Sequence, residues 1–198
     1  PQIIVISDEI YEHINFTQQH ASMAHFEDMY DRTVTVNGVS KAFSMTGWRI
    51  GYIGAPEYIA RACNKMQGQV TSGANCIGQK AAVTALENSP SKIKYMIDAF
   101  KERRGLILGL LADIDGFKIN EPQGAFYVFP DISYYFGKTL RGTTINSATD
   151  FSLYLLENAK VATVTGEAFG DPNCIRISYA ASNDDITAAM SQIKEVLT

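Results

Sequence analysis

The first half of the chain alternates between short apolar runs and segments with the spacing of amphipathic helices. Ile3–Ile6 is a continuous β-branched run, which is typical of a strand buried on both faces of a parallel sheet. The same criteria predict further strands at 33–36 and 49–53, and helices at 57–69 and 77–86. This alternation indicates a parallel α/β arrangement.

The clearest helix pattern begins at Ser89-Pro90 and continues to about residue 112. Its apolar residues recur every three or four positions over about six turns, which gives the helix one apolar face. Beyond it we predict strands at 117–120, 125–129, 161–164 and 174–179, and helices at 147–159 and 182–197. The predicted fold is therefore α/β over residues 1–99, followed by a smaller α+β domain over 100–198, with the helix of about 90–112 linking them.

Composition and charge narrow the classes of function. The chain has 198 residues, and its 17 basic and 21 acidic side chains give a net charge of −4. It therefore lacks the basic field that attracts nucleic acid or an acidic membrane, and no apolar run approaches the roughly 20 residues of a membrane span. The three cysteines form no CxxC pair, so we expect neither a disulfide framework nor a metal site. Because the opening residues also lack the basic segment of a signal peptide, we expect a cytoplasmic protein.

The densest group of polar and glycine residues lies between the second and third predicted strands, in SKAFSMTGWRIGY. Lys41 follows the strand at 33–36, and α/β sheets place functional groups at that end of a strand. An apolar surround would desolvate the amine and make it a usable nucleophile or Schiff-base former. Arg49 begins the next strand and could hold a phosphate through two hydrogen bonds. Isolated Lys and Arg residues are usually surface charges, however, and spacing alone does not identify the chemistry.

Two other segments carry charges at the end of a strand or inside one. Asp8 follows the first strand, where it is either a ligand contact or the cap of the following turn, and Tyr11 is placed to reach the same crevice. Arg176 alternates with Ile175 and Ile177 in an apolar strand. A buried arginine needs an anionic partner, which is either an internal carboxylate or the carboxylate of a substrate.

Together these three segments resemble one enzyme family. The strings SDEIYE, SKAFSMTGWRIGY and CIRISYAAS occur in this order and look like motifs of the class I/II aminotransferases, which are pyridoxal phosphate (PLP) enzymes of fold type I. The resemblance extends along the whole chain and points to the aspartate aminotransferase branch. It implies the C-terminal part of the large PLP-binding domain, with a mixed and mostly parallel sheet, followed by the small C-terminal domain.

The resemblance also implies a role for five residues of the first two segments. Lys41 matches the lysine that binds PLP covalently and shuttles the proton during the reaction. Asp8 matches the carboxylate that pairs with the pyridine nitrogen and lets the ring accept electrons. Tyr11 matches the hydroxyl at the cofactor O3′, Arg49 matches a phosphate ligand, and Ser40 matches a helper at the same phosphate.

Arg176 matches the arginine that binds the substrate α-carboxylate, which favours a substrate over an internal carboxylate as its partner. The implied reaction is a ping-pong transfer of the amino group between an amino acid, aspartate or a similar one, and a 2-oxo acid. The resemblance implies a homodimeric enzyme of amino-acid biosynthesis. The alternatives are a PLP-dependent C–S β-lyase on the same scaffold and the ligand-sensing domain of a regulator.

The chain departs from the family pattern in three ways. Thr165-Gly166 stands where members often have Pro-Gly, in a loop that borders the substrate entrance. No arginine occurs between Arg61 and Arg103, where one subgroup carries a second arginine for a side-chain carboxylate. Full members are also considerably longer, so we expect the C-terminal half of an aminotransferase, inactive by itself, whose first hundred residues expose apolar faces that the other half would cover.

Overall fold

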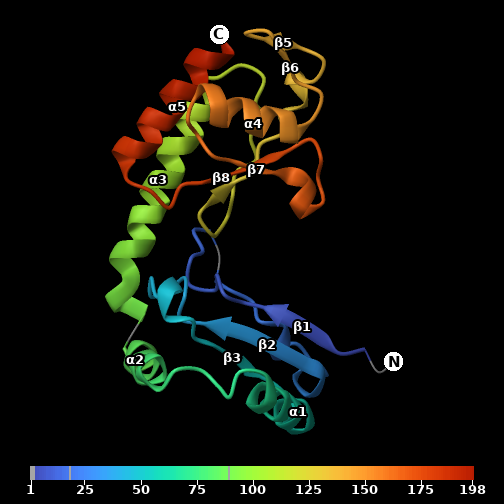
Figure 1. Ribbon diagram of the computed structural model, residues 1–198. Coiled ribbons are helices and arrows are strands. Elements are labelled where there is room, and N and C mark those ends of the chain that lie inside the picture. Colours follow the sequence, from blue (N-terminus) through green and yellow to red (C-terminus); the bar gives the residue numbers. More distant parts are fainter. Residues whose placement is uncertain (1–2, 18, 89) are drawn as a thin grey trace. The chain divides into compact units, whose positions relative to one another are not determined.

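The computed structural model describes residues 3–17, 19–88 and 90–198 (Figure 1). The chain divides into two compact units, residues 1–97 and residues 98–198. The longest helix, α3 (Lys94–Ala112), contains the point of division. The assignment of residues 1–99 to a PLP-binding domain and of 100–198 to a small domain stays a prediction.

The first unit is built on a three-stranded sheet with the order β1-β2-β3. Strand β1 (Val5–Asp8) pairs in parallel with β2 (Thr33–Gly38), and β2 pairs antiparallel with β3 (Gly51–Gly54). The sheet is therefore mixed, as the resemblance implies, and β3 is its antiparallel member. Helices α1 (Glu57–Val70) and α2 (Cys76–Glu87) follow β3, close to their predicted bounds.

Strand β1 is not buried on both faces, so the prediction for Ile3–Ile6 is wrong in this respect. Ile6 is 74% exposed and Ile3 is 61% exposed, whereas Val34 in the neighbouring strand is buried. All four residues of β3 are exposed as well. Within the described residues β1 and β3 are the outer strands of the sheet, and Ile6 of β1 and Tyr52 and Ile53 of β3 are exposed. The core of this unit is correspondingly small, with a buried cluster of Val39, Ile50 and Ala82.

The second unit holds the larger core. Its sheet has the antiparallel order β4-β8-β7, from strands β4 (Tyr127–Val128), β7 (Val164–Thr165) and β8 (Ile175–Ser178). The remaining elements are the hairpin β5 (Thr139–Leu140) and β6 (Thr143–Thr144), and the helices α4 (Ala148–Asn158) and α5 (Asn183–Leu197). Among the residues that the structure describes, nineteen buried apolar side chains from α3, β4, α4, β8, α5 and their loops form one cluster, so a single core joins these elements.

Helices α4 and α5 begin at the serine caps that their sequences predict. Ser147 Oγ accepts a hydrogen bond from the Asp150 amide at 3.1 Å, and Ser182 Oγ accepts one from the Asp185 amide at 3.1 Å. Each cap satisfies an amide that has no partner inside its helix. The buried stripe of α5 consists of Ile186, Met190, Ile193 and Val196.

The strand predicted at 117–120 is wrong. Lys118 makes only an isolated bridge with Asp131, and β4 pairs with β8 instead. Arg104 holds the intervening loop, because its guanidinium pairs with Glu121 at 2.6 Å and also donates to the carbonyl oxygen of Pro122. The Arg104 side chain is only 12% exposed, so its charge is largely withdrawn from solvent.

The start of α3 and the state of the cysteines complete the description of the fold. The predicted helix start at Ser89 lies outside the described residues, and 90–93 forms a 3-10 turn before α3. The three cysteines are free thiols, and Cys174 is the buried one. Burial raises the pKa of Cys174 to about 11, so this thiol is unreactive at neutral pH. In the described part of the chain, no helix is both long enough and apolar enough to span a bilayer.

We predict that the two units differ in amide hydrogen-exchange protection. The large shared core should protect α4, α5 and β8 strongly, whereas the exposed strands β1 and β3 should exchange faster. Exchange followed by mass spectrometry on the intact chain tests this. Equal protection of the two units in a monomer would contradict it.

Candidate functional site

A pocket of about 320 Å³ lies at the carboxyl ends of β1 and β2. Parallel pairing sets Asp8 opposite Val36, so both strands deliver their following residues to the same edge of the sheet. The pocket is lined by Asp8, Ile10, Val36, Asn37, Ser40, Lys41, Thr46 and Arg49. Four residues predicted from the sequence, Asp8, Ser40, Lys41 and Arg49, are therefore brought together.

The turn after β2 presents Lys41 to this pocket. Val39 is fully buried and Ala42 is 6% exposed, so the residues on both sides of the Ser40-Lys41 pair anchor the turn in the core. The Lys41 Nζ lies 5.8 Å from the centroid of the Tyr11 ring. Tyr11, predicted for the same crevice, thus lies beside the lysine.

Asp8 combines the two alternatives that its sequence position left open. Its Oδ1 accepts a hydrogen bond from the Ile10 amide at 3.1 Å, which caps the turn after β1. The same residue lines the pocket. The cap therefore fixes the direction in which this carboxylate is held rather than competing with a contact to a ligand.

Arg49 has a strained backbone. Its φ of 57° and ψ of 46° lie in the left-handed region, which residues other than glycine rarely adopt. The residue closes the 3-10 turn Thr46–Trp48, and its Nη1 donates to the carbonyl oxygen of Thr46 at 2.8 Å. Strain of this kind persists where the surrounding structure demands it, and it is concentrated at functional sites.

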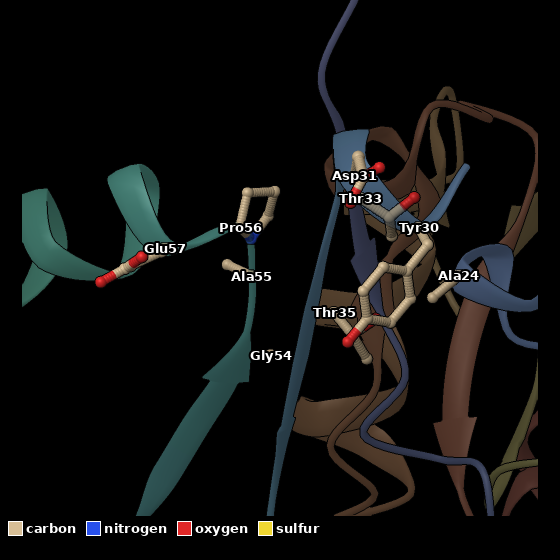
Figure 2. A pocket seen from close by; sticks show the side chains of 9 residues that line it. All are labelled: Ala24, Tyr30, Asp31, Thr33, Thr35, Gly54, Ala55, Pro56 and Glu57. Carbon is tan, nitrogen blue, oxygen red and sulfur yellow. The ribbon is translucent and has the colours of Figure 1, made fainter. Parts of the chain in front are cut away.

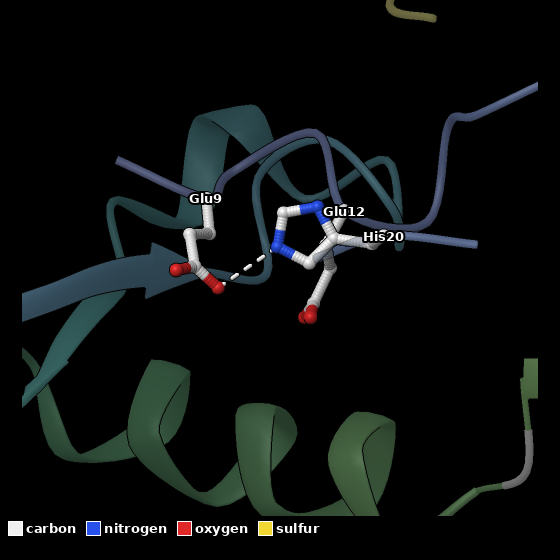
Figure 3. Close-up of side chains that lie close together, drawn as sticks. All are labelled: Glu9, Glu12 and His20. Atoms are coloured by element: carbon white, nitrogen blue, oxygen red, sulfur yellow. Dashed lines mark hydrogen bonds and ion pairs between the residues drawn. The ribbon is translucent and has the colours of Figure 1, made fainter. Parts of the chain in front are cut away.

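Behind Asp8, a buried carboxylate ties β1 to a distant loop. Glu9 is 5% exposed, and it accepts hydrogen bonds from Ser22 Oγ at 2.8 Å and from Ser7 Oγ at 3.1 Å. Its second oxygen lies 2.9 Å from His20 Nε2 (Figure 3). Burial alone would raise the pKa of Glu9, but the hydrogen bonds from His20, Ser22 and Ser7 outweigh it and lower that pKa.

Glu12 extends the same group of side chains toward β2. Its Oε1 accepts a hydrogen bond from Asn37 Nδ2 at 2.7 Å, and Asn37 Oδ1 accepts one from the Gly38 amide at 2.7 Å. One ligand-type atom each from Glu9, Glu12 and His20 lies within 4.8 Å of the others. Cysteine spacing, the basis for expecting no metal site, carries no information about this set. Both of its carboxylates already accept hydrogen bonds from the protein, so the set holds the loop after β1 to the end of β2.

Arg176 lies in the second unit, in the central strand β8. The Cζ of its guanidinium is 4.5 Å from the centroid of the Tyr127 ring and 4.2 Å from that of Phe169. Among the residues that the structure describes, no carboxylate forms an ion pair with this guanidinium. The internal ion pair considered from the sequence is thus not found there, and aromatic rings surround the charge instead.

A second pocket in the first unit has a different chemistry. Its volume is about 360 Å³, and it lies where β2 begins and β3 ends (Figure 2). The polar side chains that line it are hydroxyls and carboxylates, those of Tyr30, Asp31, Thr33, Thr35 and Glu57. Because its lining includes no cation, this pocket does not suit a phosphate, unlike the one beside Arg49.

Comparisons with known proteins agree on one family. The profile of the family described as "Aminotransferase class I and II" matches residues 2–193. A bifunctional aspartate aminotransferase and glutamate/aspartate-prephenate aminotransferase from Petunia hybrida is 50% identical over 202 residues, which cover all of this chain and 42% of the relative. An aspartate aminotransferase from Pinus pinaster is 46% identical, with 100% of this chain and 41% of the relative covered.

Solved structures give the same result. The aspartate aminotransferase from Rhizobium meliloti superposes with a TM-score of 0.93 at 41% identity, covering 98% of this chain and 49% of that one. An aromatic aminotransferase from Pyrococcus horikoshii gives a TM-score of 0.88 at 37% identity, covering 98% of this chain and 51% of that one. The chain thus spans about half the length of the proteins it matches.

We predict that Glu9 makes the first unit sensitive to acid. Because the folded pKa of Glu9 lies below its ordinary value of 4.5, the charged carboxylate stabilises the fold above that pH. This contribution is lost as the pH falls through the lowered pKa. Urea unfolding followed by the fluorescence of the single tryptophan, Trp48, reports on this unit.

Glu9→Gln should lower the free energy of unfolding at neutral pH by about 1–3 kcal/mol and flatten its dependence on pH below 4.5. Glu27→Gln is the matched control, since Glu27 is exposed. Identical pH profiles for the unsubstituted chain and Glu9→Gln would show that the carboxylate has no such role.

We also predict that the positive φ of Arg49 lowers the stability of the fold. Arg49→Gly should be more stable than Arg49→Ala by about 1 kcal/mol, because glycine adopts a positive φ without strain and both variants remove the same cation. Thermal unfolding followed by circular dichroism measures this difference. A glycine variant no more stable than the alanine variant would show that the backbone at position 49 is not strained.

Proposed function

The chain belongs to the class I and II aminotransferase family, and from this premise we propose that it carries PLP-dependent transfer of an amino group between an amino acid and a 2-oxo acid. The observation that carries the proposal is the convergence of Asp8, Ser40, Lys41 and Arg49 on one pocket. Since the chain spans about half the length of its relatives, the activity is proposed for the protein to which these residues belong.

The residues around the pocket fit PLP. A phosphate needs a cation and hydroxyl donors, and Arg49, Ser40 and Thr46 line one pocket together. An aldehyde needs an amine, which Lys41 supplies, and a protonated pyridine nitrogen needs a carboxylate, which Asp8 supplies. When bound, PLP provides an electron sink for the carbon that loses a proton.

We assign the chemistry to the side chains as follows. The Lys41 Nζ holds the cofactor and moves the proton of the substrate carbon. The Asp8 carboxylate keeps the ring nitrogen protonated, and its cap to the Ile10 amide orients it for this task. Tyr11, beside Lys41, supplies a hydroxyl to the cofactor oxygen. Arg49 and Ser40 bind the phosphate.

Arg176 binds the α-carboxylate of the substrate in this proposal. The absence of an ion pair to any described carboxylate supports this role, because a partly buried guanidinium is best satisfied by an anion. The amino donor we propose is aspartate or a similar amino acid, since the names of several relatives specify aspartate. Because an aromatic aminotransferase is among the matched structures, an aromatic amino acid should be tested as amino donor beside aspartate.

A C–S β-lyase on the same scaffold is distinguished by its products. Incubation of the PLP-loaded protein to which these residues belong with aspartate should yield a 2-oxo acid and pyridoxamine phosphate, whereas a lyase would release pyruvate and ammonia from a cysteine conjugate. A ligand-sensing domain would bind an amino acid without yielding either set. The homodimer, the role in amino-acid biosynthesis and the cytoplasmic location stay predictions.

We predict that borohydride reduction in the presence of PLP modifies Lys41. Peptide mass spectrometry should find the pyridoxyl adduct on this lysine, and Lys41→Ala should abolish that adduct. Lys65→Ala is the matched control, because Lys65 is exposed on α1, away from the pocket lining. Labelling spread evenly over the exposed lysines, with no preference for Lys41, would contradict the proposal. We expect little or no turnover from the 198-residue chain alone, because it spans only about half the length of its relatives and so supplies only part of the positioning that the reaction needs.

A further inference from the structure

The guanidinium of Arg176 has an aromatic environment that the role of carboxylate binding does not by itself require. Two rings from different segments lie close to its Cζ, Tyr127 at 4.5 Å and Phe169 at 4.2 Å. Tyr127 belongs to β4, and Phe169 ends the 3-10 turn Gly166–Phe169. Neither residue was identified from the sequence, because the two are 42 positions apart and share no motif spacing.

Backbone packing seats Phe169 beside Arg176. The Gly166 amide donates to the carbonyl oxygen of Cys174 at 2.7 Å, next to β8, and the Asp171 amide donates to the carbonyl oxygen of Gly166 at 3.1 Å. A β-carbon at Gly166 would overlap the carbonyl oxygens of both Asp171 and Cys174. Only glycine therefore allows the turn to approach the strand this closely, which brings the Phe169 ring against the guanidinium.

The sheet holds the other side of this arrangement. Tyr127 is paired with Ser178 and Val128 with Ile177, so β4 lies in register beside β8. Ile175 and Ile177, on either side of Arg176, are buried in the core. The backbone of Arg176 is thus fixed by the sheet. The orientation of its long side chain is set by the groups that contact it.

We propose that Tyr127 and Phe169 are positioning residues, which hold the Arg176 guanidinium in the orientation that binds a carboxylate. The inference rests on the proposed function, in which Arg176 binds the substrate α-carboxylate. Aromatic rings attract a guanidinium electrostatically and by stacking, and they satisfy it without occupying its N–H groups. Those donors stay directed at a carboxylate, which accepts two of them side by side.

Preorganisation explains why rings serve better here than an internal carboxylate. An arginine side chain loses rotamer entropy when it is ordered. Rings that order it before the substrate arrives remove that cost from binding. An internal carboxylate would also order the side chain, but it would compete with the substrate for the same donors. Phe169 is 46% exposed, so its ring can contact the substrate next to the carboxylate.

The test measures the binding of succinate to the intact 198-residue chain by NMR titration. Phe169→Leu should weaken succinate binding by about threefold to tenfold, and Phe169→Tyr, which keeps the ring, should stay within about twofold of the unsubstituted chain. The Arg176 side-chain N–H signals should lose their ring-current shift in Phe169→Leu and keep it in Phe169→Tyr. The ring-current shift reports that the ring lies against the guanidinium. The rescue of succinate binding in Phe169→Tyr is the result that a general loss of packing at this position would not give.

Tyr134→Leu is the matched control. Tyr134 is an aromatic residue of the same unit, 52% exposed, whose ring lies against Lys138. Its removal should leave both succinate binding and the Arg176 signals unchanged.

The outcomes separate this inference from the function on which it rests. Arg176→Gln that abolishes binding, together with Phe169→Leu that leaves it unchanged, would overturn the positioning role alone. Arg176→Gln that binds succinate as well as the unsubstituted chain would overturn the substrate role of Arg176. No succinate binding by the unsubstituted chain would overturn both.

Discussion

The parallel pairing of β1 with β2 sets Asp8 opposite Val36, and the rest of the candidate site depends on that register. Because both strands run in the same direction, Asp8 at the end of one and the Ser40-Lys41 turn after the other reach the same edge of the sheet. A shift of one residue would turn the side chain of Asp8 to the opposite face of the sheet. The antiparallel β3 then returns from this edge, which is why Arg49, just before β3, lines the same pocket.

Buried polar contacts keep that register in place around a small core. Glu9 ties the end of β1 to Ser22 and His20, and Glu12 ties the following turn to Asn37 in β2. These groups lie directly beside the proposed ligands of PLP, so stability and function are coupled in the same few residues. In the second unit a large apolar core holds the strands together. There Arg176 is contacted by two aromatic rings rather than by ions.

Much of this could be predicted from the sequence, and the exceptions have physical causes. The starts of the helices predicted at 147 and 182 are local features, and the structure confirms them with Ser147 and Ser182 as the caps of α4 and α5. The prediction of a strand at 117–120 is wrong because that segment makes only an isolated bridge, between Lys118 and Asp131, and β4 pairs with the distant β8 instead. The convergence of Asp8 and Lys41 was foreseen because strand ends in α/β sheets follow a rule. The Glu9–His20 contact and the rings around Arg176 follow no such rule, since they join segments that only the tertiary fold brings together.

The central claim is that the ends of β1 and β2 form one site for PLP, with Lys41 as its covalent anchor. A crystal structure of this chain soaked with PLP tests that claim most directly. We predict electron density continuous with Lys41 Nζ, the phosphate beside Arg49 and Ser40, and the ring nitrogen at Asp8. Density for PLP on another lysine, or a phosphate bound away from Arg49, would contradict it.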